Sequence, residues 1–211
     1  MKKKNQDDWD KVYSSKKNLK KLPWLRTVIP EWFLKIVNNP RWVEPCLALD
    51  LGCGNGYYAY FLSNKGFKVT GVDVSKKIIA VAKKTYTNNN LEFKELDVFS
   101  SHLLTNNYDF TYDIGLFHNI LPERRKEYVD VIASKLNKKG KFLLFCFDKR
   151  EKTFNNKPIY LNTLYDMYSY PLSKEEIIKT FSSKFKIEKI IEHRYGTNNY
   201  KRRFICLMSK K

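Results

Sequence analysis

The chain has 211 residues, of which 43% are hydrophobic and 15% aromatic, so it can form a packed core and is not a disordered protein. Its four cysteines form no C-x-x-C pair, which argues for a reduced, cytoplasmic protein without a disulfide framework or a zinc knuckle. No apolar run reaches the roughly 20 residues that cross a bilayer, and no apolar stretch follows the charged N-terminus, so we expect neither a membrane span nor a secretory signal.

The formal net charge is +18, and more than half of it lies at the two ends of the chain. Residues 1–21 carry a net charge of +5, and residues 201–211 carry another +5. Such an excess is typical either of a solvated surface or of a protein that binds nucleic acid or another anionic partner. Most of the basic residues are lysines, which read phosphate geometry less well than arginines, so we favour the solvated surface and keep nucleic acid as the alternative.

Residues 1–45 form an N-terminal segment ahead of the main domain. Apolar residues at helical spacing in W-D-K-V-Y, residues 9–13, predict a short amphipathic helix. Pro30 can open a second helix, whose apolar face includes Trp32. We interpret Trp32 and Trp42 as packing residues.

Residues 46–211 alternate strand patterns with helix patterns, which predicts an α/β domain with a parallel sheet and helices on both faces. The predicted helices cover 57–64 and begin after Ser75, at Pro122 and after Ser173, with the two serines as N-caps. Residues 137–140 are predicted to form a turn, and residues 148–172, which show no clear period, an insertion. The predicted strands are 46–51, 67–72, 91–96, about 110–117, 141–147, 185–192 and 201–208.

A glycine-rich turn, L-D-L-G-C-G-N-G at 49–56, joins the first predicted strand to the helix that follows. Its glycines allow a sharp turn and let a ligand touch the backbone. Asp73 ends the second strand 21 residues after Gly52, close to the ~20 residues expected for an acid that binds ribose hydroxyls. Asp97 ends the third strand, so Asp50, Asp73 and Asp97 should meet at the carboxyl edge, where open α/β sheets bind ligands.

Two details distinguish this loop from a pyrophosphate site. Its glycines follow G-x-G-x-G rather than G-x-G-x-x-G, and Asp50 precedes the first of them. Clustered acids repel phosphate and favour a cation. The loop therefore suits a ligand with adenosine at one end and a positive charge at the other.

In order and spacing, residues 46–147 resemble the core of the class I S-adenosylmethionine-dependent methyltransferases. The resemblance implies a Rossmann-like, doubly wound sheet of seven strands, mostly parallel with an antiparallel last strand. It also implies that S-adenosylmethionine is the cofactor and S-adenosylhomocysteine the product. In that family the glycine loop wraps the methionyl part, the acid at Asp73 binds the ribose hydroxyls, and the acid at Asp97 binds the adenine amino group. The implied cofactor-binding residues are Asp50, Gly52, Cys53, Gly54, Gly56, Asp73, Val74, Asp97, Val98, Leu116 and Phe117.

A second resemblance concerns the methyl acceptor. Residues 108–125, the N-terminal W-D-K-V-Y and Pro23-Trp24 are similar to small-molecule methyltransferases of the thiopurine and thiol methyltransferase group. The resemblance implies that residues 1–45 form a lid over the cofactor and that the insertion at 148–172 lies near the acceptor. The glycine that commonly precedes the proline–tryptophan pair is replaced by Leu22. The implied lid and substrate residues are Trp9, Tyr13 and Trp24.

His118 follows the fourth predicted strand and is the candidate catalytic residue. A hydroxyl or amine acceptor needs a base to remove its proton, whereas a thiolate needs little help. His118 can titrate near neutral pH and would be that base; the alternative is that it packs in the pocket wall. Asp113 is interpreted as structural, and no role is given to His102 or His193.

The sequence H-N-I-L-P at 118–122 differs from the N-P-P-[YFW] motif of enzymes that methylate base amines. We therefore predict a monomeric, metal-free methyltransferase that acts on a small molecule such as a thiol. The alternatives are an RNA or protein methyltransferase and a cofactor-binding regulatory module. A cavity with many aromatic side chains suits an apolar, aromatic or soft acceptor. The aromatic residues that could line it are Trp9, Tyr13, Trp24, Phe117, Tyr160, Tyr165 and Tyr168.

Overall fold

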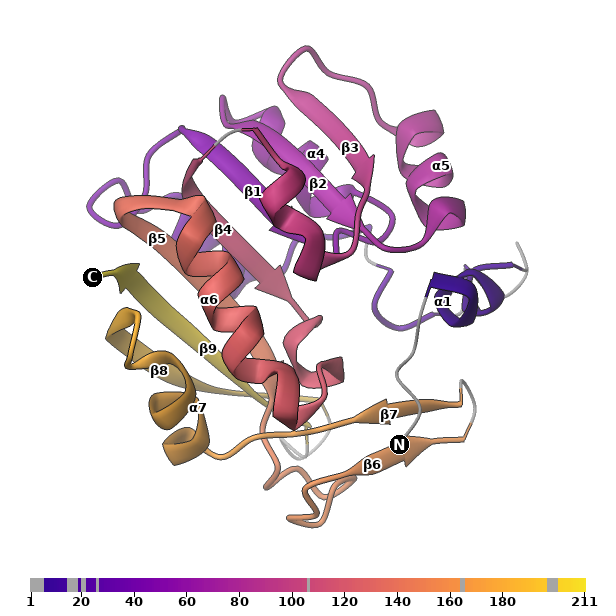
Figure 1. The fold of residues 1–211 in the computed structure, drawn as a ribbon, viewed down its shortest axis with the longest axis vertical. Coiled ribbons are helices and arrows are strands. Elements are labelled where there is room, and N and C mark those ends of the chain that lie inside the picture. The colour runs from indigo at the N-terminus through magenta and orange to yellow at the C-terminus, as the bar shows by residue number, and fades with distance from the viewer. Residues whose placement is uncertain are drawn as a thin grey trace.

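The computed structural model describes residues 6–14, 19, 22–25, 27–105, 107–163, 166–196 and 201–211. Its central feature is a seven-stranded sheet with the strand order β3-β2-β1-β4-β5-β9-β8 (Figure 1). The strands of this sheet are β1 (Leu47–Leu51), β2 (Lys68–Asp73), β3 (Leu91–Glu95), β4 (Tyr108–Ile114), β5 (Leu136–Phe147), β8 (Phe185–Tyr195) and β9 (Lys201–Lys210).

Strands β1 to β5 pair in parallel, whereas β9 runs antiparallel to both of its neighbours, β5 and β8. This confirms the predicted fold class, a mostly parallel sheet of seven strands whose last strand is antiparallel. The strand order reverses at the centre, where β1 lies between β2 and β4. Sheets of this kind bind ligands outside the carboxyl ends of the strands at that point.

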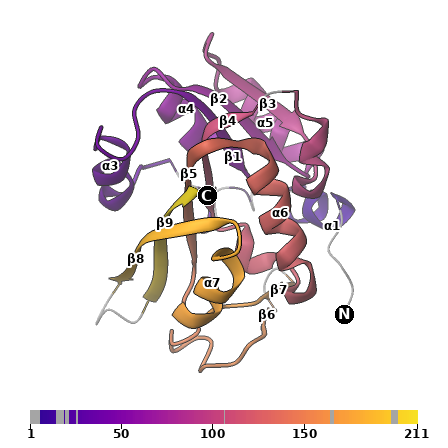
Figure 2. The same ribbon diagram turned by 60° about the vertical axis from the view of Figure 1, so that its left-hand side comes forward.

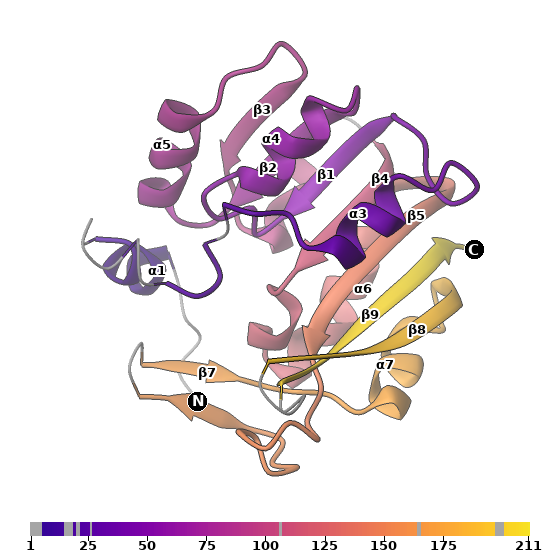
Figure 3. The ribbon, with the colours of Figure 1, turned by 180° about the vertical axis from the view of Figure 1, so that it is seen from behind.

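Helices cover both faces of the sheet (Figures 2 and 3), so its central strands β1, β2 and β4 are largely buried on both sides. Alternate residues of a strand point to opposite faces. In β5, Phe142 and Leu144 accordingly join one core cluster and Leu143 joins the other. The first cluster includes residues of α6 (Arg125–Lys135) and α7 (Lys174–Phe181), and the second includes residues of α3 (Glu31–Val37), α4 (Tyr57–Ser63) and α5 (Lys76–Thr85).

Both predicted serine caps are present. The Ser75 hydroxyl accepts a hydrogen bond from the Ile78 amide at 3.3 Å and starts α5. Ser173 forms a capping box with Glu176 at the start of α7, in which each side chain accepts from the other residue's amide. A cap of this kind stabilises a helix by about 1 kcal/mol, because it satisfies an amide that has no partner within the helix.

The structure differs from the prediction around β4 and β5. Strand β4 begins at Tyr108 and ends at Ile114, earlier than expected. Residues 137–140, predicted as a turn, lie inside β5, because Leu136 already pairs with Tyr108. The turn signal instead marks an irregularity in the strand, where Lys139 has a φ of 64° and the register shifts.

Three short 3₁₀ helices and a hairpin complete the described structure. The hairpin, β6 (Tyr160–Asn162) and β7 (Met167–Ser169), lies within the predicted insertion and is antiparallel. It projects from the lower part of the molecule in Figure 1, on the side toward which the β4 arrow points. The 3₁₀ helices are η1 (Val98–Leu103), η2 (Phe117–Asn119) and η3 (Pro122–Arg124), so Pro122 opens η3 and α6 follows it.

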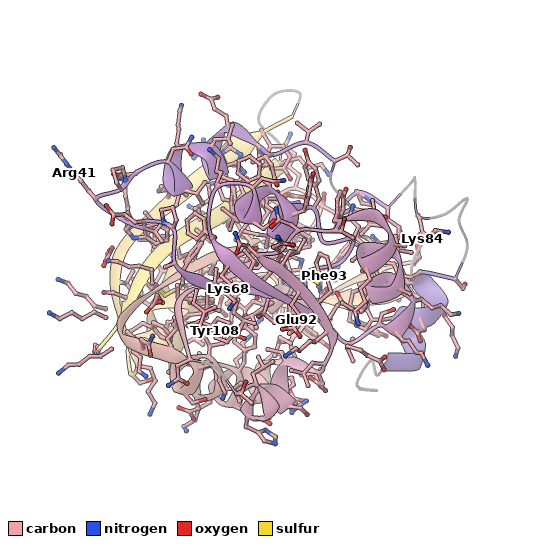
Figure 4. All side chains as sticks on the ribbon, turned by 90° about the horizontal axis from the view of Figure 1, so that it is seen from above. Arg41, Lys68, Lys84, Glu92, Phe93 and Tyr108 are labelled. Carbon is pink, nitrogen blue, oxygen red and sulfur yellow. The ribbon has the colours of Figure 1, made fainter. Side chains whose placement is uncertain are left out.

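Gly56 closes the glycine loop where β3 approaches it. Its φ is +80°, and a Cβ atom built there would lie 2.3 Å from Cζ of Phe93. Phe93 is buried, whereas Arg41 and Lys84, which are labelled near the rim of the view in Figure 4, are exposed. Only glycine therefore lets the loop pack this closely against β3.

Gly56→Ala should destabilise the fold more than Gly66→Ala. Both glycines have positive φ, so each substitution costs about 1–2 kcal/mol of backbone strain. At Gly66 the nearest atom to a new Cβ is 3.5 Å away, whereas Gly56 adds a clash worth roughly 1–3 kcal/mol. Urea unfolding measures the free energy of unfolding of the two variants. An equal loss of stability in both would show that Phe93 causes no clash at Gly56.

Candidate active site

A cavity of about 1440 Å³ lies at the carboxyl ends of the central strands. It exceeds the ~300–1,000 Å³ of a typical small-ligand pocket, so it has room for a cofactor and an acceptor together. The predicted site residues that line it are Trp9, Tyr13, Trp24, Asp50, Gly52, Cys53, Gly54, Asp73, Val74, Asp97, Val98, Leu116, His118, Tyr160 and Tyr168.

Three predicted site residues are not among those that line the cavity. Gly56 faces Phe93, as described above. The Phe117 ring is fully buried in the core instead, 5.0 Å from the rings of Tyr128 and Phe181, because η2 turns it toward α6 and α7. Tyr165 lies outside the described residues.

Asp73 connects the end of β2 to the glycine loop. Its Oδ2 accepts a hydrogen bond from the Gly54 amide at 3.0 Å, and its Oδ1 accepts one from the Ser75 amide, also at 3.0 Å. Burial raises the pKa of this carboxyl to about 6, although the two amide bonds oppose the rise and nearby Asp10 adds to it. The site thus holds an acid at high energetic cost, a feature of binding sites.

Asp50 is the second buried acid, at the end of β1. Only 3% of its surface is exposed, and its Oδ2 has no hydrogen-bond partner among the described residues. Burial raises the pKa of Asp50 well above its ordinary value; the nearby Tyr112 hydroxyl opposes this rise, and neighbouring Asp113 and Asp73 add to it. A buried acceptor without a donor is costly, so an ammonium or other cationic donor would stabilise it.

The opposite wall of this acidic region is formed by the segment after β3. The Phe99 amide donates to Asp97 Oδ1 at 3.1 Å, which fixes the carboxylate at the start of η1. The Arg124 guanidinium carbon lies 3.3 Å from the centre of the Phe99 ring. Together with Val74 and Val98, these residues give the region a flat, partly apolar wall with one carboxylate on it.

Helix α1 (Gln6–Val12) lies against α5 (Figure 1), and Trp9 of this helix lines the cavity. Asp10 accepts hydrogen bonds from the Ser75 hydroxyl and, at 3.2 Å, from the Lys77 amide, so it binds the first turn of α5. The Tyr13 ring stacks on Trp9, and its hydroxyl accepts from the Trp24 indole N–H at 3.2 Å. Three aromatic residues of the N-terminal segment are thereby held in one wall of the cavity.

His118 lies beyond the acidic region, in η2. Its ring stacks on Phe147 with 3.5 Å between ring centres, and its Nδ1 is buried without a hydrogen-bond partner among the described residues. Burial lowers the pKa of His118 well below its ordinary value, and the charges of Arg203 and Arg125 lower it further. The imidazole is therefore neutral at neutral pH and a weak base.

Asp113 is structural, as interpreted from its place in the strand. It is fully buried in β4, where its Oδ1 accepts from the amides of Gly115 and Leu116 and its Oδ2 accepts from the Tyr128 hydroxyl. These bonds shape the turn that leads from β4 to His118. Burial raises the pKa of Asp113 to about 7, and the hydrogen bonds oppose this rise.

The sequence interpretation missed one whole end of the cavity. Trp32, assigned to packing alone, lines the cavity and stacks on Phe145 with 4.9 Å between ring centres and parallel planes. His193, given no role, also lines it. No local pattern marks this group, because it depends on where β8 and β9 join the sheet. The other residues missed there are Glu151, Phe154, Tyr195, Lys201 and Arg203.

The residues that the structure describes contain no group of three or more His, Cys, Asp or Glu side chains arranged to hold a metal ion. They also contain no helix with the length and apolar character needed to cross a membrane.

Comparison with known proteins identifies the chemistry. Residues 48–140 match a family model described as a methyltransferase domain. An uncharacterised methyltransferase of Schizosaccharomyces pombe is 28% identical over 107 residues, which cover 50% of this chain and 74% of that one. The protein is a methyltransferase.

Solved structures share the fold of this methyltransferase over nearly its whole length. An S-adenosylmethionine-dependent methyltransferase from Anabaena variabilis has a TM-score of 0.76 at 20% identity and covers 98% of this chain and 95% of its own. A Burkholderia thailandensis N1-methyltransferase, solved with 1,6-didemethyltoxoflavin and S-adenosylhomocysteine, has a TM-score of 0.73 at 17% identity, covering 98% and 87%.

The residues of the methyltransferase fit S-adenosylmethionine as a cofactor. The cofactor carries a cationic sulfonium and an ammonium group, and Asp50 presents a buried carboxylate oxygen without a partner among the described residues. The positive φ values of Gly52 and Gly54 keep side chains out of the loop that faces the cavity. The acidic end of the cavity therefore has the charge and the bare backbone that such a ligand needs.

Asp113→Asn should change how stability depends on pH. The folded pKa of about 7 is above the ordinary 3.8, so the folded state binds an extra proton between these values. The stability that Asp113 contributes is present below about pH 4 and is lost as the pH rises through 7. As the pH rises through this window, the free energy of unfolding of the variant should increase relative to that of the wild type by up to about 1.4 kcal/mol per pH unit.

Urea unfolding at pH 5, 6, 7 and 8 measures this change. Asp109→Asn is the matched control, since Asp109 lies on the same strand but is exposed. Its stability should follow the wild type at every pH. If the stability of Asp113→Asn also changed with pH as that of the wild type does, Asp113 would not bind an extra proton in the folded state.

Proposed function

We propose that the protein transfers a methyl group from S-adenosylmethionine to a small molecule whose acceptor atom is a thiolate or another soft nucleophile. The observation that carries this proposal is the division of one cavity into an acidic end at the glycine loop and an aromatic, basic end beyond His118. The acidic end suits the cofactor, and the other end has the size and chemistry for a small acceptor.

The cofactor is proposed to lie along the carboxyl ends of β1, β2 and β3. Asp50 and the loop backbone would hold its amino group, and Asp73 would bind its ribose hydroxyls. Asp97 would bind the adenine amino group, with Val74 and Val98 against the adenine ring. When bound, the cofactor supplies a methyl group that its sulfonium already activates, and the leaving electron pair returns to sulfur.

The acceptor is proposed to bind beside His118 as an anion. The positive charges of Arg203 and Arg125 lower the pKa of His118. The same charges would lower the pKa of a thiol placed there, because they stabilise its thiolate. A thiolate needs no base, so His118 would contact and orient the acceptor as a neutral ring rather than remove its proton.

Residues 1–45 are proposed to act as the lid of this site, and residues 148–172 as its floor at the acceptor end. In support, Trp9, Tyr13 and Trp24 line the cavity from one side, and Tyr160 and Tyr168 of the β6–β7 hairpin line it from another. Exclusion of water by such aromatic walls would prevent hydrolysis and strengthen charge interactions inside.

The basic ends favour RNA or protein as a second candidate acceptor, but part of that charge is used internally. Arg202 pairs with Asp148 at 3.1 Å and Glu192 at 3.3 Å, and Arg203 pairs with Glu151. Lys210 donates to the Leu136 carbonyl at 2.6 Å. These groups are less available to phosphates than the sequence suggests, so a small acceptor remains the better proposal.

Asp73→Ala should weaken cofactor binding by about 2 kcal/mol, roughly thirtyfold, because it removes charged hydrogen bonds to the ribose. Calorimetry with S-adenosylhomocysteine measures this change. Asp130→Ala, on the outer side of α6, should bind like the wild type. Wild-type affinity in the Asp73 variant would show that the ribose binds elsewhere.

A panel of thiols, phenols, amines, RNA and protein, incubated with cofactor labelled in its methyl group, tests the acceptor class. We expect label in small thiols, and turnover of a thiol within about threefold of wild type in His118→Gln, since no base is required. Transfer to RNA or protein alone would reject the proposal. A loss of about a hundredfold in turnover in His118→Gln would instead indicate that His118 acts as the base.

A further inference from the structure

Arg203 is a deeply buried arginine in the wall of the acceptor end. It lies on β9 opposite Phe147 of β5, and only 6% of its surface is exposed. Its guanidinium carbon is 4.1 Å from the centre of the Phe147 ring and 5.6 Å from that of Tyr195. The two aromatic rings therefore hold the guanidinium in a fixed position.

Only part of this guanidinium is engaged by protein. Its Nη1 donates to Glu151 Oε2 and, at 2.6 Å, to the Arg202 carbonyl. Nε and Nη2 have no hydrogen-bond partner among the described residues, yet neither is a fully buried unpaired atom. Because Arg203 lines the cavity, these donors are accessible from it.

The Nε–Nη2 edge of an arginine matches the two oxygens of a carboxylate. Two other arginines of this chain use it in that way. Arg124 binds Glu127 with both atoms at 2.8 Å, and Arg150 binds Asp148 with Nε at 3.0 Å and Nη2 at 2.8 Å. In Arg203 the same edge has no acid of the described residues as its partner, and the residue lines the cavity.

The charge around Arg203 is not cancelled by Glu151. Burial lowers the pKa values of His118 and His193, and the positive charge of Arg203 lowers each of them further. Lys201 lines the same end of the cavity. An anion bound here would be stabilised by the surrounding charge as well as by the guanidinium edge.

Aromatic rings line this end of the cavity. Trp32 lies parallel to Phe145, and the Phe154 ring packs against Phe147 at 5.0 Å and against Tyr160 at 5.3 Å. His118 and the Arg203 guanidinium lie 3.5 Å and 4.1 Å from the centre of the Phe147 ring, so a molecule that reaches both must pass the edge of this ring. Aromatic surfaces of this kind bind planar, conjugated molecules.

We propose that the methyl acceptor is a planar aromatic molecule that carries a carboxylate, bound side-on by Nε and Nη2 of Arg203, with its nucleophile toward His118. This inference rests on the proposed function, since it names the acceptor class of that same site. Arg203 then acts as the specificity-determining residue, and Glu151 orients it through Nη1.

The test compares 4-mercaptobenzoate with 4-mercaptobenzamide, which share the ring and the thiol but differ in charge. Calorimetry on the protein saturated with S-adenosylhomocysteine gives the ratio of the two affinities. We expect the wild type to prefer the carboxylate at least tenfold, since charged hydrogen bonds contribute more than neutral ones. Equal affinities would overturn the proposal.

Three variants locate the preference. Arg203→Gln alone would leave the buried Glu151 carboxylate without its charged partner and could unfold the chain, so Glu151→Gln and Arg203→Gln are combined. In this double variant the ratio should fall to within about twofold of one. In Glu151→Gln alone it should rise severalfold, because the competing carboxylate is gone. A preference that survives in the double variant would overturn the proposal, and an unchanged ratio in Glu151→Gln would do so too.

Arg194→Gln is the matched control, because Arg194 lies on neighbouring β8, opposite Arg202, and its side chain is 53% exposed. It removes the same charge outside the cavity and should keep the wild-type ratio. Methyl transfer separates the two proposals. If both thiols are methylated equally well, the function stands and the carboxylate inference fails. If neither S-adenosylmethionine nor S-adenosylhomocysteine binds, both fail.

Discussion

The two hydrogen bonds that the Gly54 and Ser75 amides donate to Asp73 are the interaction on which the rest of the site depends. They join the glycine loop, the end of β2 and the start of α5 around one buried carboxylate. Asp10 binds the same turn of α5, so helix α1 is attached at this point as well. One acidic side chain thereby places the loop, the sheet edge and the N-terminal segment around a common cavity.

That arrangement has an energetic cost that a ligand can offset. Asp50 and Asp73 are both buried, and burial raises the pKa of each carboxyl because the charged form loses its hydration. A bound cation with hydrogen-bond donors would stabilise the charged forms. The acidic end of the cavity is thus an electrostatic match for S-adenosylmethionine, and this physical reasoning agrees with the methyltransferase family model over residues 48–140.

The other end of the cavity depends on the place of β9 in the sheet. Because β9 lies between β5 and β8, Arg203 faces Phe147 across the β5–β9 pair and His193 across the β8–β9 pair. The hydrogen bond from Arg203 to Glu151 then connects residues 52 positions apart in the chain. The acidic end of the cavity and its basic, aromatic end result from two halves of the sheet that are built by different connections.

The sequence by itself determined the sheet, the serine caps, the glycine loop and the acids at the ends of β1 to β3, because each of these depends on short-range spacing along the chain. It also indicated that Asp113 is structural, from its place inside a strand. It did not reveal that Phe117 turns into the core, that Trp32 faces the cavity or that Arg203 enters the acceptor end. Those placements were decided by the tertiary structure alone, since they depend on how distant strands pair and which face of the sheet each side chain meets.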